Sequence, residues 1–210
     1  MILAGLFAGV MCLGLILGDW FYFVRLTPDA SRYGCTVARS RDRFGDADAA
    51  RLRVRFDVDG ALTLPHGIAR YDSELHHIAI RPQYHLFSMS FRTLWPLKGL
   101  IHLTPDEQAF SAVCIKRVPW SSALITLAWF LIVGVGTLSF MVDYAVQGGF
   151  GSLTGILMGA GIFGIGLLVF VFGLMTVVVS YRLENSRLTQ VYSELKEVVE
   201  QTAPAARLTM

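Results

Sequence analysis

The side chains best suited to chemistry are the five histidines and the three cysteines, and most of them fall in one stretch. Imidazole and thiolate groups are common ligands of zinc, copper and iron. The spacing does not favour a metal site, because His76 and His77 are adjacent and would point to opposite faces of a strand. There is also no HExxH or CxxC motif. We predict no metal and keep three histidines as minor candidate ligands: His76, His77 and His85.

The sequence also gives little support for a nucleophilic or redox active site. A disulfide between Cys35 and Cys114 would require an oxidising compartment, whereas the distribution of charge places this stretch in the cytoplasm. No GxSxG elbow or glycine-rich phosphate loop lies between a strand and a soluble helix. We therefore expect neither catalytic residues nor a cofactor, and we do not expect an enzyme.

The composition is typical of a membrane protein with one modest extramembrane domain. Of the 210 residues, 54% are hydrophobic and 16% are charged, against about 25% charged residues in soluble proteins. The mean hydropathy is +0.53. The formal net charge of +2, without a dense basic run, argues against a nucleic-acid partner.

Three charge-poor stretches are long enough for a membrane span of about 20 residues. The first stretch predicts an anchor over residues 1–24. We expect this anchor to stay uncleaved, because a signal peptide would have Lys or Arg before its apolar run and this stretch has none. The other two stretches predict a hairpin over 119–181, with spans 119–143 and 151–181. The predicted fold is therefore an integral membrane α-helical protein with three transmembrane helices. A small all-β or α+β domain, residues 25–118, is inserted between helices 1 and 2, and an amphipathic helix and tail follow over 182–210.

The positive charges predict the orientation. All 18 Lys and Arg residues lie between Arg25 and Arg117 or after Tyr181, and such residues favour the cytoplasmic side. We therefore expect a bacterial inner-membrane protein with a periplasmic N-terminus, and with the polar domain and the C-terminus in the cytoplasm.

The polar domain has the pattern of short strands. Apolar and charged residues alternate over Leu52–Val58, and the pair Asp59-Gly60 then precedes Ala61–Leu64, which predicts a β-hairpin. Further strands are expected at Gly34–Ala38, Leu75–Ile80, His85–Thr93, Gly99–Leu103 and Ala109–Lys116. About six short strands predict a small β-sandwich or partial barrel.

Two patterns indicate association surfaces. Small residues recur along the third span, and such residues let helices approach closely in lipid. The helix that approaches could be the other helix of the hairpin or a helix of another subunit. The residues are Gly155, Gly159, Gly166 and Gly173, with Gly134 and Gly136 on the second span. The tail has an apolar seam at helical spacing, formed by Leu188, Val191, Leu195 and Val198. This seam could dock a partner, lie on the membrane or fold back onto the polar domain.

These patterns favour a non-catalytic accessory or assembly subunit of a larger inner-membrane complex. Its expected partners are membrane lipids and other membrane-protein subunits, with a homo-oligomer as one form of the complex. The alternative is a sensor or anionic-lipid-binding module, in which basic residues of the hairpin contact headgroups, namely Arg51, Arg53 and Arg55. A metal- or redox-dependent protein is the minor alternative.

Overall fold

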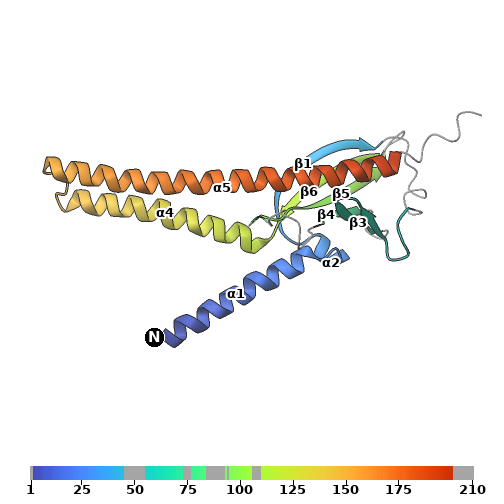
Figure 1. The fold of residues 1–210 in the computed structure, drawn as a ribbon, viewed down its shortest axis with the longest axis horizontal. Helices are drawn as coiled ribbons and strands as arrows, with labels where there is room; N and C mark the ends of the chain where they lie inside the picture. The colour runs from blue at the N-terminus through green and yellow to red at the C-terminus, as the bar shows by residue number, and fades with distance from the viewer. Residues whose placement is uncertain are drawn as a thin grey trace, which may run out of the picture.

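The structure, a computed structural model, describes residues 2–44, 55–72, 77–83, 93, 95–105 and 110–200. An apolar helix and a short second helix come first, followed by six strands and two long helices (Figure 1). The elements are α1 (Ile2–Val24), α2 (Pro28–Ser31), β1 (Cys35–Phe44), β2 (Ala61–Leu64), β3 (Gly67–Asp72), β4 (His77–Pro82), β5 (Lys98–Pro105), β6 (Phe110–Val118), α4 (Trp120–Val146) and α5 (Leu153–Glu200).

Three helices, α1, α4 and α5, are long and apolar enough to cross a membrane. They have 23, 27 and 48 residues, which corresponds to about 35, 40 and 72 Å at 1.5 Å per residue. In the described part of the chain their apolar stretches are almost entirely exposed. The helices α4 and α5 lie side by side as an antiparallel hairpin whose turn is remote from the sheet, while α1 diverges from them (Figure 1).

The strands form a single antiparallel sheet in the order β1-β6-β5-β4-β3-β2. The strands from β2 to β6 follow one another as a meander, and β1 joins the far edge by pairing with β6, with an irregularity between Thr36 and Ala38. The predicted count of six strands is confirmed. The predicted sandwich or partial barrel is wrong, because the second layer over this sheet is a helix.

The predicted hairpin at Asp59-Gly60 is not formed by the described residues of its first strand. The tight turn exists, since Gly60 has a φ of +69° and its N–H donates to the Asp57 carbonyl at 2.7 Å. However, residues 55–60 form turns and bends, and β2 pairs with β3 instead. The strand β3 was not predicted. The rest of the predicted first strand, residues 52–54, lies outside the described residues, as do residues 85–92 of the predicted strand His85–Thr93.

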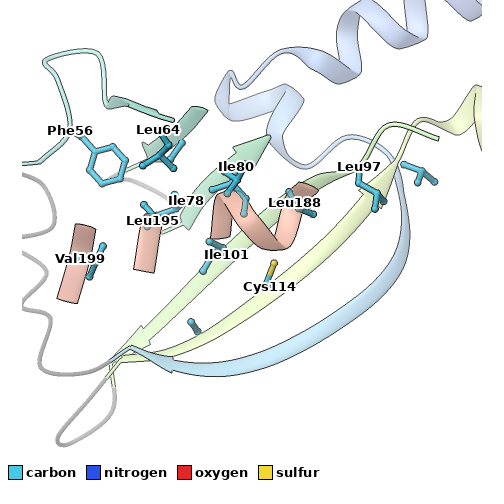
Figure 2. Close-up of a cluster of buried hydrophobic side chains, with 14 residues drawn as sticks. Phe56, Leu64, Ile78, Ile80, Leu97, Ile101, Cys114, Leu188, Leu195 and Val199 are labelled. Carbon is cyan, nitrogen blue, oxygen red and sulfur yellow. The ribbon is translucent and has the colours of Figure 1, made fainter. Parts of the chain in front are cut away.

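The core lies between the sheet and the last third of α5. Figure 2 shows Leu188, Leu195 and Val199 of the helix facing Ile80 and Ile101 of the sheet. In this interface Leu188, Leu195 and Ile101 are 0–1% exposed. Burial of a side chain of this size contributes about 1.5–3 kcal/mol, so the helix supplies a large part of the stability of the sheet.

The apolar seam of the tail is thus covered by the sheet of its own chain, which was one of the alternatives left open by the sequence. Leu188, Val191 and Leu195 are buried and Val198 is half-buried. The expected boundary between residues 181 and 182 falls inside α5, which continues without interruption to Glu200. The tail is therefore the end of the third long helix.

The four glycines of α5 that the sequence singled out lie in close contacts within the hairpin. A Cβ atom on Gly166 would lie 2.5 Å from Thr137 Cγ2, and one on Gly173 would lie 2.1 Å from Trp129 Cζ3. Gly159 faces Phe150 and Gly155 faces the backbone of Gly149, both in the turn that joins the two helices. On α4, Gly134 is near Phe170, whereas in the described structure nothing lies within 4 Å of a Cβ on Gly136.

Candidate functional site

Asp19, near the end of α1, holds the first turn of α4. Its Oδ2 accepts hydrogen bonds from the backbone N–H of Ser121 at 3.0 Å and from Ser121 Oγ at 2.5 Å. The neighbouring Trp20 donates its indole N–H to Ser122 Oγ at 3.3 Å. The first N–H groups of a helix lack intrahelical acceptors and carry partial positive charge. Asp19 therefore caps α4 from another helix and fixes α1 against the hairpin.

The same carboxylate also binds the segment that follows α2. The Tyr33 hydroxyl donates a hydrogen bond to Asp19 Oδ1, and this bond raises the pKa of Tyr33 to about 12. The Tyr33 ring meets the Tyr22 ring edge-on, with 4.9 Å between the ring centres. A single acidic residue thus joins α1, α4 and the start of the polar domain.

Lys98, the first residue of β5, is a buried cation at the end of α1. It is 1% exposed, and its Nζ donates hydrogen bonds to the carbonyls of Phe23 at 3.1 Å and Ala30 at 2.5 Å. Burial lowers the pKa of Lys98 to about 7, and the nearby Arg117 and Arg81 act in the same direction. Near neutral pH this side chain therefore exists in both protonation states.

The sheet supplies cations to the carboxyl end of α1, which has no basic residue in its own last turn. Arg81 Nη1 donates to the Val24 carbonyl at 2.9 Å, while Lys98 binds the Phe23 carbonyl. Positive charge at this end of a helix is favourable, because the last carbonyls lack intrahelical donors. The chain thus satisfies both the end of α1 and the start of α4 with side chains from distant parts of the sequence.

The described histidines form contacts typical of structural residues. Ser31 Oγ donates its proton to the Pro28 carbonyl at 2.6 Å. The Nε2 atom of buried His77 lies 3.0 Å from the same Ser31 oxygen. Because the hydroxyl proton is already used, Nε2 is the donor in the hydrogen bond between His77 and Ser31. The rings of His77 and His102 lie 5.9 Å apart, and burial lowers the pKa of His102. Among the described residues no three His, Cys, Asp or Glu side chains are grouped to hold a metal ion.

The other residues singled out by the sequence are described only in part. His76, His85, Arg51 and Arg53 lie outside the described residues, and Arg55 is exposed in the turns before β2. Cys35 and Cys114 are both free thiols. The predicted surface for anionic headgroups on residues 51–55 is therefore described only at its last residue.

The face of the sheet opposite α5 is basic, and the end of α1 together with α2 covers its middle, where Lys98 and Leu100 are each 1% exposed. Alternation along the strands places a small second apolar cluster there, around Leu100 and Ile115. The strand pairings put one set of cationic side chains on the same face: Arg39, Arg41, Arg43, Arg70, Arg81, Lys98 and Arg117. The acidic side chain that the described strands place on this face is Asp72, at the end of β3. We call this surface the basic face.

The face of the sheet covered by α5 has mixed charges that pair with one another. Asp42 Oδ2 accepts hydrogen bonds from Lys196 Nζ at 3.1 Å and from the Tyr192 hydroxyl at 3.2 Å, and these bonds lower the pKa of Asp42 despite the opposing effect of burial. Lys116 Nζ donates to Asn185 Oδ1 at 2.5 Å. The two faces of the sheet therefore differ in both cover and charge.

Comparison of the chain with protein-family models, with curated proteins and with solved structures finds no match.

Proposed function

We propose that this chain is a non-catalytic accessory or assembly subunit of a larger complex in the bacterial inner membrane, anchored by three transmembrane helices. In this proposal the basic face of the sheet binds an acidic surface of another subunit. The observation that carries the proposal is the contrast between the two sheet faces: α5 covers one of them, while the other presents exposed arginines along β1.

The packing of α5 on the sheet supports the three-span topology. The sheet follows α1 in the chain, and the end of α5 follows the apolar part of that helix. Direct contact between the sheet and the end of α5 requires both to lie on the same side of the membrane. That condition is met when α4 and α5 both cross the bilayer. The turn between them lies at the end remote from the sheet (Figure 1), as such a pair of crossings requires.

For the orientation, we propose a periplasmic N-terminus and a cytoplasmic sheet, because Lys and Arg avoid the N-terminus and the turn between α4 and α5. Protease added to inverted inner-membrane vesicles should cleave loops of the polar domain, whereas protease added to spheroplasts should leave them intact. A tag at the C-terminus should behave in the same way. Cleavage in spheroplasts alone would reverse the orientation.

The occupant of the basic face follows from its charge. Arg39, Arg41 and Arg43 are exposed on β1, which is the outer strand of the sheet in the part of the chain that the structure describes. Charged residues steer partners and select among them, and charges on an edge strand also prevent unwanted strand pairing. We therefore propose a partner protein with an acidic surface at the cytoplasmic side of the membrane.

Reversing these charges tests the proposed partner. The wild-type protein, cross-linked in membranes and then solubilised, should copurify with a stoichiometric subunit, and replacing Arg39, Arg41 and Arg43 by glutamate should abolish this association. The matched control, Thr189→Glu with Gln190→Glu, adds acidic residues on the exposed side of α5 and should retain it. All five positions are exposed, so effects on stability should stay within about 0.5 kcal/mol each.

The proposal fails if the wild-type protein runs as a lone monomer, or if the arginine variant keeps its partner. Recovery of a second copy of this chain, lost on the same charge reversal, would identify the complex as a homo-oligomer. Weakening of the association at high salt is expected for an interface of this kind, because exposed charges are screened beyond about 10 Å at 0.1 M salt.

A further inference from the structure

A groove of about 470 Å³ lies between the end of α1 and the β2–β4 edge of the sheet. Its walls are apolar towards the middle of α1, where Leu17 and Phe21 lie one helical turn apart, and Ile68 of β3 faces them. At its other end the groove is lined by three arginines: Arg25, Arg70 and Arg81. The cavity is thus apolar along one part and cationic at the other.

The arginines come from separate elements, and each is positioned by a different part of the fold. Arg25 follows the last residue of α1 and is exposed, whereas Arg70 and Arg81 are half-buried on neighbouring strands of the basic face. Arg81 Nη1 donates to the Val24 carbonyl, which orients its guanidinium towards the end of α1. Together the three provide donors that suit a phosphate.

The apolar part of the groove opens beside two exposed apolar side chains of α1. Phe21 is 72% exposed and Leu17 is 47% exposed, and Trp20 lines the same groove. Trp and Tyr concentrate at the headgroup level of a bilayer, and the sequence Trp20-Phe21-Tyr22 ends the first span. In the proposed topology, Leu17 and Phe21 therefore lie next to acyl chains, and the arginines lie at the level of the phosphates.

We infer that this groove binds an anionic phospholipid, with its phosphate at Arg25, Arg70 and Arg81 and an acyl chain along Leu17 and Phe21. The inference rests on the proposed membrane topology and adds a ligand that the proposed assembly role does not require. The volume is within the range of small-molecule sites, about 300–1,000 Å³. A soluble phosphate compound would satisfy the arginines but would leave the apolar part of the groove unused.

The test uses the full chain in a mild detergent and native mass spectrometry to measure bound lipid. Dioleoyl-phosphatidylglycerol should bind at least about fivefold more tightly than dioleoyl-phosphatidylcholine. Arg25→Gln and Arg70→Gln should each weaken phosphatidylglycerol binding by about fivefold, the equivalent of about 1 kcal/mol per basic residue at an anionic surface. The matched control, Arg39→Gln, removes a cation from the same sheet face away from the groove and should bind as the wild type does.

Three outcomes would overturn the inference. The two lipids could bind equally, the Arg25 and Arg70 variants could bind phosphatidylglycerol as tightly as the wild type, or inorganic phosphate could displace it completely at equal concentration. The last result would assign the arginines to a free phosphate. Lipid binding in detergent does not depend on the orientation of the protein in the membrane. A failure of this lipid-binding test would therefore leave the results of the protease and copurification experiments unchanged, and a failure of the proposed function would show in those experiments.

Discussion

Replacing Leu195 by aspartate is expected to unfold the sheet and to separate it from α5. Leu195 is 0% exposed and lies in the cluster formed by the helix and the sheet. Truncation of such a leucine to alanine costs about 2–5 kcal/mol, and an unpaired carboxylate in the same place adds a further desolvation cost. The total is comparable with the stability of a whole domain, about 5–15 kcal/mol.

Limited proteolysis and thermal unfolding in detergent would measure this effect. The Leu195→Asp variant should be cleaved rapidly in the strands, whereas Gln190→Asp, on the exposed side of the same helix, should resist cleavage like the wild type. The hairpin of α4 and α5 should remain helical by circular dichroism, because its contacts lie elsewhere. Equal resistance of the two variants would show that the end of α5 does not form the core of the sheet.

The second large effect concerns Lys98 and pH. Its pKa is lowered to about 7 from an ordinary value of 10.5, first by burial and then by Arg117 and Arg81. Between these two values the unfolded chain binds more protons than the folded protein, so protonation favours unfolding and stability rises with pH. One proton taken up on unfolding corresponds to about 1.4 kcal/mol per pH unit.

Thermal unfolding in detergent between pH 7 and 8.5 would measure this slope. In that interval the other shifted groups contribute little: the pKa of His102 is lowered from 6.5, that of Cys114 is raised from 9.0, and that of Tyr33 is raised to about 12. Lys98→Met should remove most of the slope, whereas Lys116→Met, on the neighbouring strand, should keep it. A steep slope that persists in Lys98→Met would refute the assignment.

The long helices and some of the strands could be predicted because their signals are local. Uninterrupted apolar runs define α1, α4 and the first part of α5, and the Gly-rich residues between the last two mark their turn. The strand β3 escaped prediction because Gly67 and Ala69 occupy its buried positions. A Cβ on Gly67 would lie 2.5 Å from Val191 Cγ2, so the approach of α5 requires small residues there and removes the apolar alternation that marks a strand.

The candidate sites could not be predicted, because they depend on contacts between distant segments. Asp19 precedes the aromatic residues Trp20–Phe23 in the sequence, but its acceptor role involves Ser121, which lies 102 residues later. A lysine between Leu97 and Gly99 reads as a solvent-exposed strand residue, whereas the structure buries Lys98 under the end of α1. The groove likewise combines the end of α1 with three strands.

The position of Leu188, Leu195 and Val199 in the chain has a consequence for biosynthesis. The ribosome makes the strands first, yet the side chains that complete their core are encoded some distance after β6, in the last part of α5. Until the end of α5 has left the ribosome, Ile78, Ile80 and Ile101 lack the helix that covers them in the folded protein. The sheet therefore completes its core only after the end of α5 has been made, and strands that expose apolar side chains until then are prone to aggregate.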